Sequence, residues 1–536
     1  MPGDDMMGNS SIIQTDAQSG ELAAPLLEEG KVDDNHVVVR GSKYMEYFNA
    51  FPGSIKYLVW NEFCERFSFY GMKTILALYL LEHLRLSENE STELVHLFIV
   101  ACYATPLLGA FLSDCKWGKY RTILYLSIVY CIGNWVMALA AAPKPSPSTK
   151  STLFWSTALA LALIALGTGG IKPCVSAFGG DQIQFTLPDS PAKDRLHRQF
   201  FSMYYFAVNA GSLISTLLTP VLRTDVSYSV AFAVPAALMM CALLIFWSGR
   251  RSYVDRPPEG NVFGEVGAVV VDAIRLRGRA GQGSHWLDSS KLKHNPTVVE
   301  DVKALFRVLI LLLPTPLFWS LFDQQSSKWV FQASKLDGHV PWLFNVVIEP
   351  DQMQALNPVL ILAMIPLFDQ IIYPFLEKHQ VPLRPVPRMV AGMVLSALAF
   401  LLSGLLQIAM DQAGATTLSM LWQIPQIMAI TAGEILFSIT GLEFAYSQAP
   451  DSMKSVVQAA WLFTVAAGNL VTVILVAIIG DHLSKANEFF FFAVGCVFAM
   501  LLLLWGGSHF VYKQDVNENQ SEYLVEALIE DRVHSG

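Results

Sequence analysis

The sequence has few charged residues, and their arrangement suits neither an enzyme nor a nucleic-acid-binding protein. Lys, Arg, Asp and Glu make up 15% of the 536 residues, whereas a soluble domain contains about 25%. The net charge is -9 and no basic block is present, which excludes nucleic acid as a partner. The chain also lacks a nucleophile–base arrangement, a phosphate-binding loop and a metal motif. We therefore expect no enzyme activity, no cofactor and no bound metal.

The seven cysteines lack a pattern as well. Their number is odd and they form no CxxC or Cys/His spacing, which argues against disulfides and zinc and favours a packing role. About the first 40 residues contain no apolar segment behind a basic one, so no cleavable signal peptide is expected. We expect residues 1–45 to form a disordered cytoplasmic tail, and the first membrane helix to direct insertion.

Long apolar runs dominate the remainder of the chain. Hydrophobic residues make up 53% of it, and a run of about 18 or more is long enough to cross a bilayer as a helix. The predicted spans are 55–82, 92–113, 122–142, 152–177, 199–222, 228–248, 305–331, 352–376, 389–410, 421–446, 455–480 and 488–511. The sequence thus predicts an all-α membrane protein with about twelve transmembrane helices.

A polar, basic segment divides these spans into two sets of six. Two six-helix bundles joined by a linker are typical of the major facilitator fold. The predicted domains are the tail 1–45, an N-terminal bundle 46–248, a cytoplasmic linker 249–303, a C-terminal bundle 304–512 and a cytoplasmic tail 513–536. Within the linker, Val266 to Arg279 is either an amphipathic helix on the inner membrane surface or an interdomain coil.

The basic residues of the short loops predict the orientation. Lys and Arg are more frequent in the loops after spans two, four and eight than in the opposite loops. The positive-inside rule then places both termini and the linker in the cytoplasm. The sequon Asn89-Glu90-Ser91 would lie outside, which makes Asn89 a candidate glycosylation site.

Charged residues inside the first six spans point to function, because lipid penalises each by about 2.5 kcal/mol or more. Helical spacing places Glu62, Glu65 and Arg66 on one face, where two acids and one base can share a proton. A fixed ion pair between helices is the alternative. His96 can gain and lose a proton near neutral pH, although a lone histidine often only packs. Lys172 follows a glycine-rich stretch and needs an anionic partner from the protein or a substrate.

The second set of spans carries its own charges. Arg307 and Asp369 are isolated in apolar sequence and are natural partners, while Glu434 is an unpaired acid that suits a cationic amine. Polar and aromatic residues that could wall a pocket accompany them: Tyr70, Tyr103, Tyr205, Asn209, Ser212, Trp319, Gln324, Gln325, Asn357, Ser438 and Trp461. Cations in one half and an acid in the other would suit a zwitterion.

Several segments resemble one known family. Asn61-Glu-Phe-Cys-Glu-Arg-Phe-Ser-Phe-Tyr-Gly71 resembles the ExxERFxYYG signature of the proton-dependent oligopeptide transporters, a major facilitator family. Family-like segments follow in order at Gly109–Lys119, Gly167–Val175 with Phe178–Gln182, Phe201–Ser212, Phe318–Gln325 and Gly433–Ser438. The resemblance covers about residues 45–512 and is closest to the animal peptide transporters. It implies a proton-coupled symporter of di- and tripeptides that works by alternating access.

The resemblance also implies roles for individual residues. Arg66 and Lys172, with Tyr70, match positions that bind the peptide carboxylate; Glu434, with Asn209 and Asn357, matches those that bind its amino terminus. Glu62, Glu65 and His96 match proton-coupling positions, and Arg307 and Asp369 match a gating pair. Trp319, Gln325 and Trp461 match pocket positions, and we add Tyr205 and Ser438 to the predicted substrate site.

Three features depart from the family pattern. Phe69 replaces the first tyrosine of the signature, so a hydroxyl group is missing next to the predicted site. Ile183 replaces a common phenylalanine, which we interpret as a packing change. The loop at about residues 411–420 is short, where animal peptide transporters carry a large extracellular domain.

Other functions remain open at this point. The chain could carry histidine, nitrate or peptide-like molecules, or it could be a peptide-sensing membrane receptor. Glu434 argues against nitrate, because an acid repels an anion. The expected partners are peptides, protons and membrane lipid. We favour the plasma membrane as the location, with an endolysosomal membrane as the alternative.

Overall fold

The computed structural model describes residues 51–510 and 512, apart from 145, 189–190, 258–261, 277–284, 341–345, 381–383 and 414–417. The two predicted tails, 1–45 and 513–536, lie outside the described residues.

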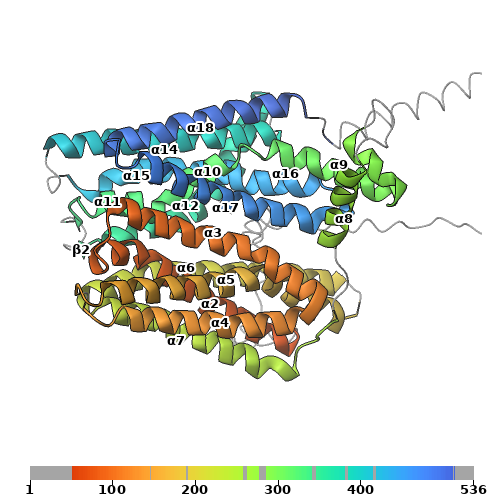
Figure 1. Cartoon of the computed structure of the whole chain (residues 1–536), viewed down its shortest axis with the longest axis horizontal. Coiled ribbons are helices and arrows are strands. Elements are labelled where there is room, and N and C mark those ends of the chain that lie inside the picture. Colours follow the sequence, from red (N-terminus) through yellow and green to blue (C-terminus); the bar gives the residue numbers. More distant parts are fainter. Residues whose placement is uncertain are drawn as a thin grey trace, which may run out of the picture.

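The first half of the chain forms a bundle of long helices, in the lower half of Figure 1. Its elements are α2 (Gly53–Leu78), η2 (Tyr79–His83), α3 (Glu88–Leu112), η3 (Ser113–Trp117), α4 (Lys119–Ala140), α5 (Lys150–Thr186), α6 (Pro191–Asp225), α7 (Tyr228–Ser248) and η4 (Gly249–Arg251). The label η marks short stretches of 3-10 or π-helix. Helix α2 packs against α6 and α7, and α4 packs against α5 and α7.

The second half forms another bundle, in the upper half of Figure 1. Its elements are α9 (Pro296–Leu311), α10 (Pro316–Phe322), η6 (Asp323–Ser326), α11 (Lys328–Ala333), β1 (His339–Val340), β2 (Val346–Val347), η7 (Pro350–Ala355), α12 (Leu356–Leu367), η8 (Phe368–Ile372), α13 (Tyr373–Lys378), α14 (Pro385–Ala413), η10 (Met420–Gln423), α15 (Ile424–Glu434), η11 (Ile435–Ile439), α16 (Thr440–Gln448), η12 (Asp451–Met453), α17 (Lys454–Ile479) and α18 (Lys485–Ser508). Strands β1 and β2 pair antiparallel. Helix α3 of the first bundle lies along α17 of the second.

The helices agree with the predicted spans in order and number. Among the described residues, 10 helical segments are long and apolar enough to cross a membrane, and the pair Pro296–Leu311 and Pro316–Ala333, bent by 46°, gives one more. The pair bends where Pro314 and Pro316 lack backbone donors. The remaining predicted span is Gly53–His83, which carries Glu62, Glu65 and Arg66.

Several helices are longer than their apolar runs predict. Helix α5 continues to Thr186 instead of ending at 177, and α6 begins at Pro191 instead of 199. A helix satisfies its own backbone hydrogen bonds, so it needs apolar side chains only within the hydrocarbon layer and can continue into water with polar ones. Reading only the apolar run therefore places the end of α5 too early and the start of α6 too late.

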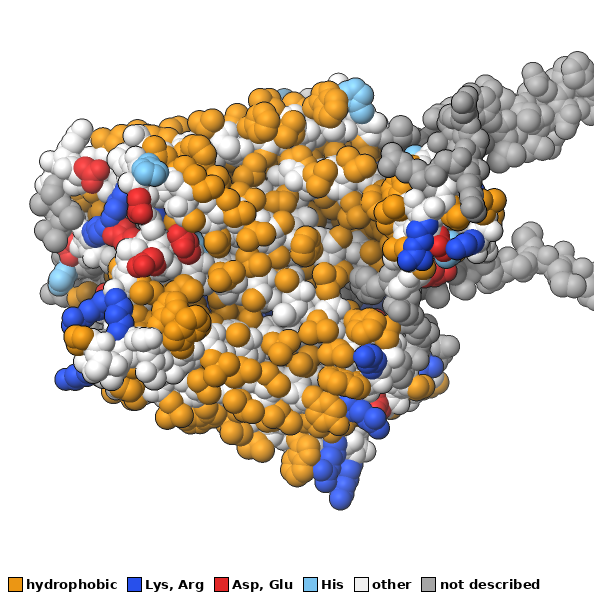
Figure 2. Space-filling view, viewed as in Figure 1, with side chains coloured by type: hydrophobic (Ala, Val, Ile, Leu, Met, Phe, Trp, Pro, Cys, Tyr) orange, Lys and Arg blue, Asp and Glu red, His pale blue; other side chains and the backbone are white. Residues whose placement is uncertain are grey.

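Each bundle has its own apolar core. One core contains residues from Leu58 to Phe246 together with Val330 and Phe331 of α11, and the other runs from Val269 to Tyr512. Glycines allow close helix contacts in the first bundle: a Cβ atom on Gly109 of α3 would collide with the backbone of Gly170 in α5. Figure 2 shows hydrophobic side chains across the middle of the molecule and charged ones toward its two ends. This distribution suits a bilayer around the middle.

The described part of the linker packs on the second bundle. It contains α8 (Val262–Arg275) and η5 (Trp286–Leu292). Val269, Ala273 and Leu287 are fully buried and belong to the core of the second bundle. Of the two predicted alternatives, a helix and a coil, the structure contains the helix. Its buried face contacts the second bundle, and it ends at Arg275. Residues 277–284 lie outside the described part. We call this end of the molecule the linker face and the opposite end the far face.

Candidate functional site

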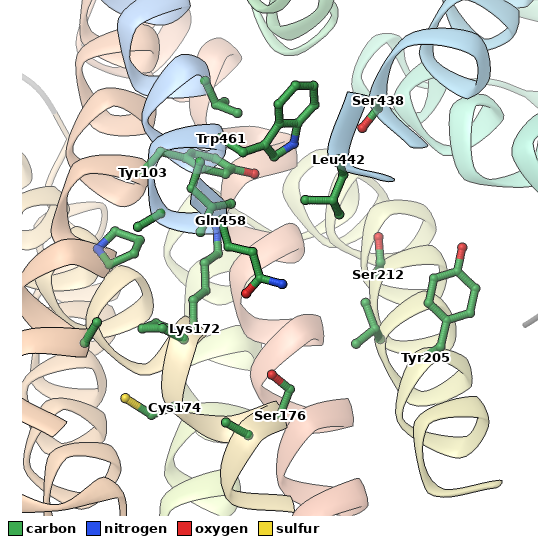
Figure 3. A pocket seen from close by; sticks show the side chains of 18 of the residues that line it. Tyr103, Lys172, Cys174, Ser176, Tyr205, Ser212, Ser438, Leu442, Gln458 and Trp461 are labelled. Carbon is green, nitrogen blue, oxygen red and sulfur yellow. The ribbon is translucent and has the colours of Figure 1, made fainter. Parts of the chain in front are cut away.

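A cavity of about 1200 Å³ lies between the two bundles. Of the predicted substrate residues, Tyr70, Lys172, Tyr205, Asn209, Trp319, Gln325, Asn357, Glu434, Ser438 and Trp461 line it. Figure 3 shows Lys172 and Gln458 on one side of this space, and Tyr205, Ser212, Ser438 and Leu442 across from them. Residues that are distant in sequence thus meet around one chamber, as the sequence predicts.

Lys172 places a positive charge in the wall of the cavity. Its ammonium group lies 3.9 Å from the centre of the Tyr103 ring and 5.2 Å from that of Phe69. Among the described residues, no carboxylate lies within ion-pair distance of this ammonium group. Aromatic faces attract cations, but they do not neutralise the charge. The arrangement leaves Lys172 able to bind an anionic group that enters the cavity.

Glu434 faces the same cavity from the second bundle. The Asn357 amide donates a hydrogen bond of 2.9 Å to Glu434 Oε2 and one of 3.1 Å to the Thr431 hydroxyl. No Lys or Arg among the described residues forms an ion pair with Glu434. An acid held by an amide, with no cation beside it, suits a positively charged ligand group.

Aromatic rings form another part of the wall. Trp319 and Trp461 pack edge to face, with ring centres 6.1 Å apart. The Trp319 indole donates to the Thr464 hydroxyl at 3.1 Å, which fixes the ring. Asn209, predicted with Glu434, donates instead to the backbone oxygen of Tyr205 in its own helix. The Trp319 and Trp461 rings offer a ligand an apolar surface without a specific polar contact, which suits varied ligand side chains.

Arg66 does not line the cavity. Arg66 Nε lies 2.7 Å from Glu62 Oε1 and 2.8 Å from Glu65 Oε2, and all three residues are buried. The Thr168 hydroxyl donates to Glu65 at 3.1 Å. The helical spacing brings the three charges together as predicted. Both acids occupy the guanidinium group, so Arg66 can reach a ligand only after these pairs loosen.

His96 lies in a fully buried hydrogen-bond network across the two bundles. Its Nδ1 is 2.6 Å from Asn469 Oδ1, and its Nε2 is 3.0 Å from Ser327 Oγ. The Asn469 amide nitrogen donates to Asp323 at 2.7 Å and to the backbone of Val465 at 2.9 Å, which leaves its oxygen to accept from His96. The geometry fits a neutral ring that carries its proton on Nδ1.

Asp323 connects this network to the cavity. It lies 3.5 Å from the Lys73 ammonium, and both residues line the cavity from opposite bundles. Lys73, Asp323 and Asn469 are not among the functional residues predicted from the sequence. Two signals were available, since Asp323 is an acid inside an apolar span and Lys73 lies seven residues after Arg66, on the same helix face.

Ion pairs close the far face. The Arg223 guanidinium at the end of α6 binds Asp351 with two contacts of 3.1 and 3.2 Å and Glu349 with one of 2.9 Å. Asp351 is fully buried and belongs to η7 of the second bundle. Nothing in the local sequence predicts this pair, because Arg223 and Asp351 lie 128 residues apart.

The cavity extends to the linker face. Its lining there includes Asp114, Lys119, Asp181 and Arg256, and Lys119 pairs with Asp181 at 2.5 Å inside the first bundle. The predicted gating residues Arg307 and Asp369 are both exposed, and none of the ion pairs among the described residues joins them. Their pairing stays a prediction for a different state of the molecule. The structure is thus closed at the far face and open at the linker face.

Asn89, the candidate glycosylation site, is half-buried at the far face. Its amide oxygen accepts from the Lys328 ammonium at 2.8 Å, and its amide nitrogen donates to Asp481 at 2.7 Å. Attachment of a glycan to this nitrogen requires a different local arrangement, and glycosylation stays a prediction.

Comparison with known proteins identifies the family. The model of the family described as "PTR2: POT family" matches residues 120–492. The chain is 32% identical to fruit-fly "Peptide transporter family 1" (Drosophila melanogaster) over 689 aligned positions, which cover 90% of this chain and 91% of that protein. The alignment is longer than the 536-residue chain, so the fly protein contains segments without a counterpart here.

A vertebrate relative is more similar over a shorter region. "Solute carrier family 15 member 2" of zebrafish (Danio rerio) is 46% identical over 360 residues, which cover 65% of this chain and 49% of that protein. The matched region thus spans about half the length of this relative.

Solved structures share the fold. A crystal structure of the POT family transporter PepTSo has a TM-score of 0.75 and 32% identity, and covers 85% of this chain and 98% of that one. The structure of an auto-inhibited POT family peptide transporter has a TM-score of 0.76 at 32% identity, with 86% and 98% covered. These matches confirm the predicted family resemblance and the twelve-helix major facilitator fold, and transporter relatives agree with the prediction against an enzyme. The chain belongs to the POT family.

Proposed function

We propose that this protein is a proton-coupled symporter of di- and tripeptides that works by alternating access. One observation carries the proposal: an ammonium group, Lys172, and a carboxylate, Glu434, face one cavity from opposite bundles, and neither has a partner of opposite charge among the described residues. A short peptide carries a carboxylate at one end and an amine at the other. It matches both groups at once, and the names of the relatives agree.

In this mechanism, Lys172 binds the peptide carboxylate, and Glu434, positioned by Asn357, binds the amine. Because each group belongs to a different bundle, a bound peptide draws the bundles together around itself. A ligand shifts a conformational equilibrium only by its difference in affinity between the states. Contacts with both peptide ends, made fully only when the bundles approach, provide that difference.

Protons enter through the buried acids and His96. In the described state Glu62 and Glu65 hold Arg66. Protonation of one acid would weaken its pair and allow Arg66 to contribute to carboxylate binding next to Lys172. Protonation of His96 would give Nε2 a proton to donate and change its bond to Ser327, which lies in the opposite bundle. Both steps couple proton loading to bundle contacts.

The linker face is proposed to lie in the cytoplasm, on the basis of the loop charges. The structure then represents the inward-open state, in which a peptide leaves through the mouth near Lys119 and Arg256. The plasma membrane remains the favoured location, with an endolysosomal membrane as the alternative.

Uptake of a labelled dipeptide into proteoliposomes that contain only this protein tests the proposal. With acid outside, we expect uptake that falls as the outer pH rises from about 5.5 to 7.5. Glu434→Gln should lose most of it and should no longer distinguish the free dipeptide from its N-acetyl form. Lys172→Gln should do the same for the C-terminal amide. Glu443→Gln, an exposed acid at the linker face, is the matched control.

Three results would contradict the proposal or favour an alternative. Uptake that is independent of pH, or unchanged by Glu434→Ala, would refute it. Competition by nitrate or histidine, but not by unlabelled dipeptide, would favour another solute. Peptide binding without flux would favour the sensor.

A further inference from the structure

The first turn of α3 is fixed in direction by its own residues. The Ser87 hydroxyl accepts from the Glu90 backbone at 3.1 Å, and the Glu90 carboxylate accepts from the Ser87 backbone at 2.8 Å. This capping box satisfies the exposed backbone donors of the helix start. It therefore holds the two residues in between, Glu88 and Asn89, in a defined orientation toward the second bundle.

Glu88 binds two lysines of the second bundle. Its carboxylate lies 2.5 Å from the ammonium of Lys335, which follows α11, and 2.7 Å from that of Lys485, the first residue of α18. The Glu88 side chain is only 24% exposed, so these pairs are partly shielded from water. One acid of the first bundle thus joins two separate segments of the second.

Asn89 is hydrogen-bonded to an ion pair of the second bundle. Lys328 is buried and bound to the buried Glu488 at 2.9 Å, and it donates a further hydrogen bond to the Asn89 oxygen. The Asn89 nitrogen donates to Asp481. An amide offers a donor and an acceptor together, so it can contact a cation and an anion at the same time. Neither Asp nor Leu could do so at this position.

These contacts all cross between the bundles at the far face. They surround a small second cavity of about 290 Å³ that is separate from the site described above. Acidic and basic side chains also gather at this end of the molecule in Figure 2. Any motion that separates the start of α3 from the second bundle here must break the contacts of Glu88 and Asn89 together.

We propose that Glu88 and Asn89, with Lys328, Lys335, Asp481 and Lys485, form a latch that stabilises the state closed at the far face. The proposal rests on the alternating access of the proposed function. The latch acts in addition to the Arg223 pairs, because it joins the start of α3 to α11, to α18 and to their adjoining segments, whereas Arg223 joins α6 to η7. It binds neither the peptide nor the transported proton, so it sets how long the far face stays closed.

A reversible cross-link tests the latch. In a variant with Asn89→Cys and Asp481→Cys, a short bifunctional thiol reagent should reduce dipeptide uptake at least tenfold, and reduction of the link should restore it. Each single-cysteine variant with the same reagent is the control for the native cysteines. Full uptake by the cross-linked double variant would overturn the latch. Failure of the unmodified protein to transport any dipeptide would instead contradict the proposed function.

A second variant tests the charge pairs without a link. Glu88→Gln keeps the shape of the side chain and removes its charge, so labelling of a cavity cysteine by an impermeant reagent from the far side should rise at least threefold. Lys150→Gln is the matched control, because Lys150 lies at the same face and donates within the first bundle, to the backbone of Arg85. Equal labelling in the Glu88→Gln variant and the unmodified protein would also overturn the latch.

Discussion

His96 of the first bundle is hydrogen-bonded to Asn469 of the second, with 2.6 Å between His96 Nδ1 and Asn469 Oδ1. The Asn469 amide nitrogen is simultaneously bonded to Asp323, which reaches the cavity. The titratable His96 ring is thus connected through the Asn469 amide to Asp323, at the interface between the two bundles that must open during transport.

Asn469→Leu should therefore shift the molecule away from the state closed at the far face. The change removes one hydrogen bond from His96 Nδ1 and one from Asp323. His96 keeps Ser327 and Asp323 keeps Lys73, so we expect a total cost of about 1–3 kcal/mol. We expect far-side thiol labelling of a cavity cysteine to increase by roughly 5- to 150-fold, the equilibrium shift that this energy corresponds to.

Asn134→Leu is the control for this change. Asn134 is also buried, but it donates to the backbone of Tyr130 within the first bundle. Its loss should lower stability and leave the labelling pattern unchanged. Equal labelling in the two variants would remove the Asn469 network from the closure mechanism.

Exchange of the charges of Arg223 and Asp351 tests the ion pairs at the far face. Removing one partner of a buried pair costs about 3–5 kcal/mol, because the other charge remains unpaired. Arg223→Asp alone and Asp351→Arg alone should each reduce dipeptide uptake more than tenfold. The double exchange should restore part of it. If the double variant reaches the membrane in folded form but recovers no dipeptide uptake, the two residues do not act as a pair.

Tyr103 should support Lys172 through its ring and not through its hydroxyl group. The ammonium lies over the ring face at 3.9 Å, a contact worth roughly 0.5–2 kcal/mol. Tyr103→Leu should raise the KM for dipeptide by about 2- to 30-fold, and Tyr103→Phe should leave it nearly unchanged. The two variants are compared in initial-rate uptake over a range of peptide concentrations. A larger effect of the Phe variant would indicate a hydrogen bond from the hydroxyl instead.

Docking of the linker should not weaken between pH 7.5 and 5.5. Hydrogen bonds from Lys293 and His294 lower the pKa of Asp272, and those from Lys291 and Lys303 lower the pKa of Asp288. A carboxylate with a lowered pKa stabilises the fold above its ordinary pKa of about 3.9, and this contribution is lost only as pH falls toward the lowered value. The pH range in which this stabilisation is lost therefore lies below pH 5.5.

Hydrogen exchange of α8, corrected for intrinsic rates, measures this docking. Exchange at pH 5.5 should be equal to or slower than exchange at pH 7.5. Asp272→Asn should accelerate it, whereas Glu265→Gln, an exposed acid on the same helix, should not. Faster exchange at pH 5.5 in the unmodified protein would contradict this account.

The sequence determined the membrane class, the twelve spans and ten of the residues that line the cavity. Apolar runs report bilayer thickness directly, and a charge in such a run is costly enough that Glu62, Arg66, Lys172 and Glu434 could be identified before any contact was known. Helical periodicity also placed Glu62 next to Arg66, since residues four positions apart lie on one helix face.

The tertiary structure alone decided which charges meet across the bundles. Arg223 with Asp351, Glu88 with Lys485 and His96 with Asn469 are pairs that no local spacing indicates. It also separated Arg66 from the cavity and Arg307 from Asp369. The physical reason is that these contacts depend on how two rigid bundles are placed relative to each other. A chain that works by alternating access must support more than one such placement, so its sequence cannot encode a single set of pairs.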